Sequence, residues 1–427
     1  MMYLVFIAML ALNISKEVLA TLGILNEDIE IRGFLNGEDP ISTANALNAI
    51  GSSIKINGTS VSIKKRDIPF KDPSVNVDLG NSGTGMRLMM GLISSLGIKA
   101  TLVGDESLTK RPMLRVANPL NDMGATVTCN EGKPPVKILD GLIKDNFSYE
   151  MPIASAQVKS SIILAALAAN KKVTVIEKHP TRNHTERMIS YFNGDIHTES
   201  YDLGNKITLM PSKLIPTKTY EVAGDFSSAS FLIVAGLIAK ESNLLIKNVG
   251  LNPTRCGLIS VLRSMGAKIK IKNERLISNE EVGDIHVVSS ELQGIAIGGD
   301  IIPNIIDEIP ILSIAASFAK GETLITEAEE LRVKESDRLQ AISDGLQKIN
   351  IHHELFHDGI KIIGSSEDIS VMAEIDSHGD HRIAMSFLIA SLRSKKGIYV
   401  EDCKNILTSF PNFIEVMSSL GVAINER

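Results

Sequence analysis

The stretch 261–271, VLRSMGAKIKI, joins a helical pattern to a β-rich run at Gly266. Glycine and asparagine suit such a junction because they tolerate the left-handed conformation that ends many helices. Five other stretches contain the same junction, which indicates that one structural unit is repeated along the chain. They are ALNAIGSSIKI (46–56), PLNDMGATVT (119–128), MISYFNGDIH (188–197), GLQKINIHHEL (345–355) and VMSSLGVAI (416–424).

The junctions are almost evenly spaced. They fall at positions 51, 124, 194, 266, 350 and 421, so the intervals are 73, 70, 72, 84 and 71 residues. Units of this length are too long for a solenoid and predict six mixed α/β units, grouped three and three. The best boundary between the groups is YEVAGD (220–225), after which Asp225 caps an apolar helical stretch. Two such groups predict a cleft for small ligands between them.

The composition excludes several classes of protein. The chain has 427 residues, 44 Lys and Arg against 50 Asp and Glu, 4% aromatic residues and no Trp. A net charge of −6 argues against a nucleic-acid partner, and the lack of aromatics argues against a surface for stacking bases. Cys129, Cys256 and Cys403 are far apart, which predicts a reducing compartment and no metal site built from cysteines.

The first twelve residues, MMYLVFIAMLAL, are almost wholly apolar. The run is too short to cross a bilayer and lacks a basic leader, so it predicts a buried strand and no membrane association. An export or membrane segment, and an incorrectly assigned start, are the alternatives.

Several short segments carry cations at the starts of predicted helices. LGNSGTGMRL (79–88) is a Gly-rich helix start with Arg87, and such starts attract anions. TKRPMLR (109–115) holds Arg111 beside a proline, and PTRNHTER (180–187) holds Arg182 in a polar loop. SAQVKS (155–160) places Ser155 and Gln157 at another helix start. For each segment, a helix cap or a solvated surface loop is the alternative interpretation.

Two further segments combine acids with bases. LRVKESDRL (331–339) contains Lys334, Glu335 and Arg338, and DHRIAM (380–385) places Arg382 at a helix start. Acids among several bases suit proton transfer next to bound anions. A protein of net charge −6 that places so many cations at the ends of elements is predicted to bind a doubly anionic small molecule. These cations are Arg87, Arg111, Arg182, Lys334, Arg338 and Arg382.

In this order, these segments resemble the EPSP synthase family, the 3-phosphoshikimate 1-carboxyvinyltransferases of the shikimate pathway. GDFSSASF and TSFPNF add to the resemblance, which covers about residues 33–427. It implies an α/β, two-domain enolpyruvyl-transferase fold in which each domain has three βαβαββ repeats around buried helices. The implied domains are 12–224 and 1–11 plus 225–427. The resemblance also implies a cytoplasmic monomer that needs no cofactor or metal.

The family transfers the enolpyruvyl group of phosphoenolpyruvate to the 5-hydroxyl of shikimate 3-phosphate. By motif match, Asp307 would accept the hydroxyl proton, Glu335 would protonate the methylene carbon, and Lys334 would contact the hydroxyl. The resemblance assigns shikimate 3-phosphate to Ser155, Ala156, Gln157, Arg182, Asp307 and Lys334. It assigns phosphoenolpyruvate to Asn81, Gly83, Thr84, Arg87, Arg111, Gln157, Arg338 and Arg382, the last two clamping the carboxylate.

One family signature is altered. Counting back from GFLNGEDP (33–40), the signature PGDKSISHR should reach residues 12–17, where the chain reads LNISKE. Leu12, Asn13 and Glu17 then replace the family Lys, Ser and Arg. This favours the alternative of a member that binds substrate without turnover. A further alternative is the sister transferase that acts on UDP-N-acetylglucosamine, which usually has a Cys a few residues before an Arg-Pro pair. GDESLTKRP (104–112) contains no Cys, which argues against this alternative.

Overall fold

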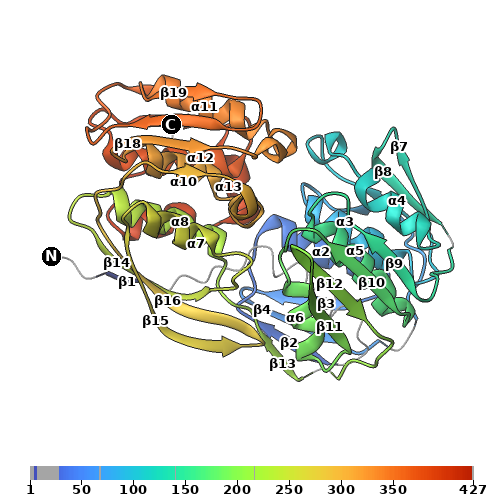
Figure 1. Ribbon diagram of the computed structural model, residues 1–427. Helices are drawn as coiled ribbons and strands as arrows, with labels where there is room; N and C mark the ends of the chain where they lie inside the picture. The colour runs from blue at the N-terminus through green and yellow to red at the C-terminus, as the bar shows by residue number, and fades with distance from the viewer. Residues whose placement is uncertain (1–3, 7–27, 67–68, 140, 216, 426–427) are drawn as a thin grey trace. The chain divides into compact units, whose positions relative to one another are not determined.

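The computed structural model describes residues 4–6, 28–66, 69–139, 141–215 and 217–425 (Figure 1). Leu12, Asn13 and Glu17, on which the altered signature rests, lie outside these ranges. The chain divides into two compact units. The N-half unit consists of Ala11–Val222 with the turn Leu276–Glu280, and the C-half unit consists of Met1–Leu10, Ala223–Arg275 and Glu281–Arg427. Each unit is described by itself below.

The N-half unit contains three four-stranded sheets. Their strand orders are β13-β2-β4-β3, β5-β6-β8-β7 and β9-β10-β12-β11. In each sheet the first pair is parallel and the other two pairs are antiparallel. The strands are β2 (Ile29–Arg32), β3 (Ser53–Asn57), β4 (Ser60–Lys64), β5 (Val77–Asp78), β6 (Ala100–Val103), β7 (Thr126–Asn130), β8 (Lys133–Leu139), β9 (Phe147–Glu150), β10 (Val173–Glu177), β11 (Ile196–Tyr201), β12 (Gly204–Leu209) and β13 (Thr219–Glu221). The helices are α2 (Glu38–Ala49), α3 (Gly83–Ile93), η1 (Leu108–Lys110), α4 (Leu114–Asp122), α5 (Ala156–Ala169) and α6 (His184–Tyr191).

The C-half unit has two sheets with the same arrangement of four strands and, among the described residues, a third sheet of two strands. Its sheets have the strand orders β1-β14-β16-β15, β17-β18-β20-β19 and β21-β22. The strands are β1 (Leu4–Phe6), β14 (Asn243–Gly250), β15 (Lys268–Ile277), β16 (Glu280–Val288), β17 (Ala296–Ile297), β18 (Gly321–Ile325), β19 (His352–Leu355), β20 (Ile360–Gly364), β21 (Ala373–Asp376) and β22 (Ile398–Glu401). The helices are α7 (Phe226–Ile238), α8 (Gly257–Ser264), η2 (Gly299–Ile301), α9 (Ile302–Ile305), α10 (Ile309–Ser317), η3 (Glu329–Val333), α11 (Arg338–Lys348), α12 (His381–Ala390), η4 (Ser391–Arg393), η5 (Cys403–Asn405), α13 (Ile406–Ser409) and α14 (Phe413–Ser419).

The predicted junctions explain the repeat. All six predicted helix ends contain a residue with positive φ, at Gly51, Gly124, Asn193, Gly266, Asn350 and Gly421. In the first two repeats an asparagine three residues earlier fastens the helix to the next strand. Asn48 exchanges two hydrogen bonds with the Ile54 backbone, and Asn121 does the same with Val127. The helix end and the strand start are therefore fixed together.

The sixth junction differs from the prediction. A β-run was expected after Gly421, but residues 422–425 form no strand. VAI supplies only three residues before the polar end of the chain, and a strand is stable only when a neighbour pairs with it. Within the apolar N-terminal run, Leu4–Phe6 form a strand as predicted, since β1 pairs in parallel with β14. In the part of the chain that the structure describes, no helix is long and apolar enough to cross a membrane.

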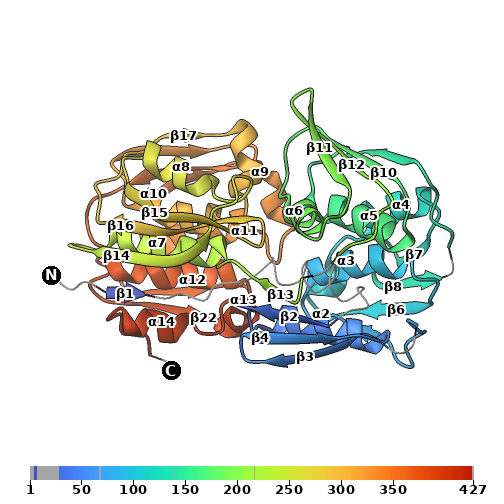
Figure 2. The same ribbon diagram turned by 90° about the horizontal axis from the view of Figure 1, so that it is seen from below.

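Apolar helices form the centre of each unit. Every residue of α7 is buried, and α7, α10 and α12 pack against one another in the C-half unit (Figure 2). A helix that is apolar on all sides belongs in the interior. In the N-half unit α3 packs on α5 so closely that a Cβ on Gly91 would lie 2.1 Å from the Ser161 carbonyl oxygen. Polar residues cap the starts of several of these helices, namely Ser82 at α3, Ser155 at α5 and Asp380 at α12.

Candidate active site

Helix α3 begins with a group of polar residues that bind one another. The Ser82 hydroxyl caps α3 by accepting a hydrogen bond from the Gly85 amide at 3.1 Å. Arg87, one turn into the helix, is 8% exposed. It donates to the Gln157 side-chain oxygen at 2.5 Å and to the Pro112 carbonyl at 3.1 Å. The helix start and a nearly buried guanidinium therefore lie together, which favours an anion.

Arg111 approaches the same helix start from the end of η1. It donates to the Asn81 side-chain oxygen at 2.6 Å and to the Ser107 hydroxyl at 3.2 Å. A Cβ on Gly83 would lie 2.9 Å from Arg111 Nη1 and 3.6 Å from Arg87 Nη1. Glycine at this position thus leaves room for two guanidinium groups beside the first turn of α3.

Helix α5 contributes the other predicted groups. Gln157 bridges the two helices, since its amide nitrogen donates to the Thr84 hydroxyl at 2.8 Å. Ser155 caps α5 by accepting from the Val158 amide at 3.4 Å, and Ala156 is the first residue of the helix. We call the residues that meet at the start of α3 the α3-start cluster. It consists of Asn81, Gly83, Thr84, Arg87, Arg111 and Gln157.

Arg182 lies on the loop between β10 and α6, and that loop is fastened to α5. The Thr181 hydroxyl donates to Glu177 at 2.6 Å, and the Thr181 carbonyl accepts from Lys159 at 3.4 Å. Lys159, on α5, is fully buried and forms ion pairs with Glu177 at 3.1 Å and with Glu186 at 2.8 Å. This interior ion pair network fixes the residue before Arg182 to the helix that carries Ser155 and Gln157.

In the C-half unit, Arg338 lies among three carboxylates. Arg338 is 1% exposed, and it donates to Asp380 at 2.8 Å and to Asp307 at 3.3 Å. Its Nη2 atom also forms a short ion pair with Glu335. Burial alone would lower the pKa of Arg338, but Asp380, Glu335 and Asp307 raise it well above its ordinary value. Arg338 therefore stays charged and holds the three carboxylates close together.

Two more cations face Asp307. Lys334 Nζ lies 3.7 Å from Asp307 Oδ1, and Arg382 donates to the Asp307 carbonyl at 2.9 Å. Burial lowers the pKa of Lys334, and the charge of Asp307 opposes that shift only in part. We call this group the Asp307 cluster. It consists of Asp307, Lys334, Glu335, Arg338, Asp380 and Arg382.

Helix α12 begins inside the Asp307 cluster. Asp380 caps the helix by accepting from the Arg382 amide at 2.9 Å, so one carboxylate serves both the cap and Arg338. Burial and then the charge of Arg382 lower the pKa of His381 to about 4. His381 is therefore a neutral imidazole at pH 7.

Asp380, Arg255 and Glu308 are not among the predicted site residues, yet each lies against one of them, namely Arg338, Asp307 and Arg382. Glu308 forms a short hydrogen bond with Ser227 and lies 3.6 Å from Arg382. Arg255 lies 3.7 Å from Asp307. Neither residue belongs to a charged run, and a single sequence does not distinguish a buried arginine from an exposed one.

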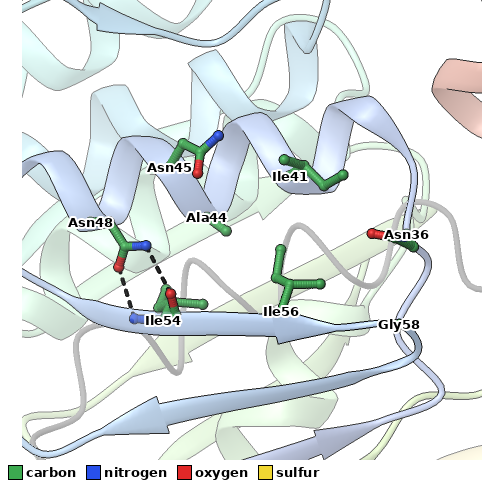
Figure 3. Close-up of a pocket in the computed structure, with 8 residues that line it drawn as sticks. All are labelled: Asn36, Ile41, Ala44, Asn45, Asn48, Ile54, Ile56 and Gly58. Carbon is green, nitrogen blue, oxygen red and sulfur yellow. Dashed lines mark hydrogen bonds between the residues drawn. The ribbon is translucent and has the colours of Figure 1, made fainter.

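A separate pocket lies in the first repeat. It has a volume of about 280 Å³ and lies between α2 and β3 (Figure 3). Asn45, Asn48, Ile54 and Ile56 are among the residues that line it, and none of the predicted site residues does. The Asn48 side chain there is occupied by its hydrogen bonds to Ile54. The pocket therefore carries none of the chemistry of the two clusters.

Comparison with known proteins finds one family. The sequence model of the EPSP synthase (3-phosphoshikimate 1-carboxyvinyltransferase) family matches residues 15–417. The chain is 45% identical to the 3-phosphoshikimate 1-carboxyvinyltransferase of Petrotoga mobilis, over 96% of this chain and 94% of that protein. It is 44% identical to the protein of that name from Ruthia magnifica, over 97% and 94% of the two chains.

The structure also resembles a solved EPSP synthase from Acinetobacter baumannii. The TM-score is 0.83 at 40% sequence identity, and the match covers 95% of this chain and 93% of that one. The family and the expected α/β fold class are thereby confirmed, while the last repeat contains the two-stranded sheet β21-β22 instead of a four-stranded one. The chain belongs to the EPSP synthase family.

Proposed function

We propose that this protein transfers the enolpyruvyl group of phosphoenolpyruvate to the 5-hydroxyl of shikimate 3-phosphate and releases inorganic phosphate. Membership of the family over residues 15–417 supports this assignment. The observation that carries it is the Asp307 cluster, in which two acids that could exchange protons share one buried arginine. Nothing in the comparisons favours a member that binds its substrates without turnover.

The α3-start cluster supplies the groups for anion binding. Arg87 and Arg111 beside the first turn of α3 suit the phosphate of phosphoenolpyruvate, because helix amides and guanidinium groups both donate to phosphate oxygens. Ser155, the Ala156 backbone, Gln157 and Arg182 suit the hydroxyls and phosphate of shikimate 3-phosphate. Gln157 contacts both Arg87 and Thr84, so it connects the two sets.

The Asp307 cluster supplies the proton transfers. In the addition step, Asp307 takes the proton of the 5-hydroxyl, and the hydroxyl oxygen forms a bond to C2 of phosphoenolpyruvate. At the same time Glu335 gives a proton to C3. In the elimination step, C3 loses a proton to Glu335, the C2–O bond to phosphate breaks, and the phosphate leaves. The two acids need different protonation states, which different surroundings can provide. Glu335 is the more exposed of the two, with 25% of its side chain accessible against 12% for Asp307.

Arg338 and Arg382 have a second assigned role, to clamp the carboxylate of phosphoenolpyruvate. Arg338 binds three carboxylates of the chain itself. A substrate carboxylate that binds Arg338 through Nη2 would replace Glu335, which is the most accessible of the three. This exchange would release Glu335 from Arg338 at the moment when a proton donor is needed.

We also propose that the protein works as a cytoplasmic monomer. The three cysteines are free thiols, which fits a reducing compartment. Light scattering after size-exclusion chromatography tests the oligomeric state, and a mass near twice 46.2 kDa would contradict a monomer.

The test is phosphate release by the purified chain given both substrates, with each substrate omitted in turn and with UDP-N-acetylglucosamine as a control acceptor. We expect release only with shikimate 3-phosphate and phosphoenolpyruvate together. The same assay is run on a variant of the chain that carries PGDKSISHR at positions 9–17. Release by that variant alone would show that the rest of the chain can catalyse the reaction and that the native residues 9–17 prevent it. No release by either chain would reject the proposed function.

A further inference from the structure

The loop before α8 carries an arginine that the proposed mechanism does not use. Arg255 is 3% exposed. Its Nη2 atom donates to the Ser227 hydroxyl at 2.7 Å and to Asp225 Oδ1 at 3.2 Å. Asp225 is also the cap of α7, since it accepts from the Ser228 amide at 2.7 Å. One side of the guanidinium is thus anchored to the start of a fully buried helix.

The other side of the guanidinium faces Asp307. Arg255 Nη1 lies 3.7 Å from Asp307 Oδ2, and among the described residues this buried nitrogen donates no hydrogen bond. A charged donor of this kind is costly to leave unused. A shift of less than about 1 Å by the Asp307 carboxylate would bring the two atoms to hydrogen-bonding distance.

Asn304 holds the loop and the segment before Asp307 together. Its side-chain oxygen accepts from the Gly257 amide at 2.9 Å, and its amide donates to the Pro253 carbonyl at 2.7 Å. Asn304 precedes Asp307 by three residues, so Arg255 and Asp307 are carried by segments that are fastened side by side. The distance between them is therefore set by the fold rather than by two independent flexible side chains.

The charges around Asp307 differ between its two oxygens. Lys334 and Arg338 face Oδ1, while Arg255 faces Oδ2. Arg382 binds the backbone carbonyl of Asp307. The neighbouring acids are Glu308, which lies 3.6 Å from Arg382, and Glu335 and Asp380, which share Arg338 with Asp307. On the Oδ1 side, Arg338 shares its donors with two other carboxylates and Lys334 is partly exposed. On the Oδ2 side, the cation is the buried Arg255.

We propose that Arg255 is a positioning residue, whose guanidinium spans the start of α7 and Asp307 Oδ2 and fixes the orientation and ionised state of that carboxylate. This inference rests on the proposed function, in which Asp307 takes the hydroxyl proton. Lysine cannot replace Arg255, because a single ammonium nitrogen does not reach both anchors.

The test compares Arg255→Gln, Arg255→Lys and the control Arg393→Gln. Arg393 also pairs with an aspartate in the C-half unit, Asp368, at 2.6 Å. The control thus removes a comparable ion pair away from Asp307. We expect Arg255→Gln to lower kcat by about 10- to 100-fold with KM for both substrates within about threefold. The acidic limb of its rate profile should move to higher pH by about one unit, because an interior cation that favours the ionised carboxylate is lost.

Arg255→Lys should lower kcat by about tenfold with a smaller shift of the acidic limb, and Arg393→Gln should keep both at the parent values. Arg255→Lys decides the outcome if Arg255→Gln fails to fold. Parent kcat and pH profile in a folded Arg255 variant would overturn the inference while leaving the proposed function intact. Absence of phosphate release both by the parent chain and by the chain with PGDKSISHR at positions 9–17 would reject the proposed function, and the inference with it.

Discussion

The α3-start cluster and the Asp307 cluster both place arginines near a helix start, but they surround them with different partners. Arg87 and Arg111 donate to amide, hydroxyl and carbonyl oxygens in the contacts described above. Arg338 instead binds Asp307, Glu335 and Asp380. Neutral partners orient a guanidinium without cancelling its charge, whereas carboxylates offset that charge. Contacts of the first kind suit reception of an anion, and contacts of the second kind suit control of acids.

Removal of Arg338 gives the largest effect that this comparison predicts. Arg338→Met leaves three carboxylates crowded together in the interior, so the free energy of unfolding should fall by about 3–5 kcal/mol. Chemical denaturation measures the change. Lys320→Met is the matched control, since Lys320 pairs with Glu291 at 2.7 Å on the surface and should contribute less than about 1 kcal/mol. A loss no larger than that of the control would show that Arg338 does not balance the three acids.

Removal of Arg111 should act on binding instead of folding. Arg111→Met deletes a charged donor at the start of α3, worth about 1.5–3 kcal/mol, so KM for phosphoenolpyruvate should rise by about 10- to 100-fold. The free energy of unfolding should change little. The neighbouring Lys110→Met loses the same charge from an exposed pair with Glu106 and should leave KM unchanged. Equal KM values in the two variants would remove Arg111 from the binding role.

His381 makes the Asp307 cluster sensitive to acid. Its pKa is about 4 in the folded chain and 6.5 ordinarily, because burial and Arg382 disfavour the charged ring. Between these two pH values His381 is protonated in the unfolded chain but neutral in the folded chain. The free energy of unfolding therefore falls as the pH falls from 6.5 to 4. The loss over this interval should be about 3 kcal/mol. His381→Gln should lack this part of the decline in unfolding experiments at several pH values, and parallel curves would contradict it.

Gly83→Ala should produce the smallest effect. The added Cβ would lie 2.9 Å from Arg111 Nη1, so the end of that side chain must move, and KM for phosphoenolpyruvate should rise by about tenfold or less. A Cβ on Gly58 meets nothing within 4 Å, but Gly58 has a φ of +58°, so Gly58→Ala should lower stability and serves as a control for KM alone. Because Gly83→Ala acts through Arg111, it should add nothing in an Arg111→Met chain. Additive effects in the double variant would show that the methyl group acts in another way.

The parts of the fold that depend on local backbone geometry were predictable from the sequence. Each of the six junctions requires a left-handed residue, and only glycine or asparagine occupies the positive-φ position in all six. The strand predicted after Gly421 was wrong, because a strand depends on a neighbour that the local sequence does not contain. The same reason explains why β1 was recognisable as a strand while its pairing with β14, about 240 residues away, was not.

The site shows the same division. Cations near helix starts mark Arg87, Arg338 and Arg382 in the sequence, since charge and capping are local properties. Their partners are not local: Arg338 reaches Asp307 and Asp380, which lie 31 and 42 residues away. Arg255 shows the limit most clearly, because its burial and its distance to Asp307 exist only in the folded chain. The roles of single residues in the reaction stay predictions.

The division of labour between the two clusters is tested most directly by Asp307→Asn. Its binding of shikimate 3-phosphate and then phosphoenolpyruvate is followed by calorimetry, and phosphate release is followed in the same samples. We predict that Asp307→Asn binds both substrates within about threefold of the parent affinity, while phosphate release falls by about 10²- to 10⁴-fold. Loss of binding in parallel with phosphate release, or release at the parent rate, would contradict the account.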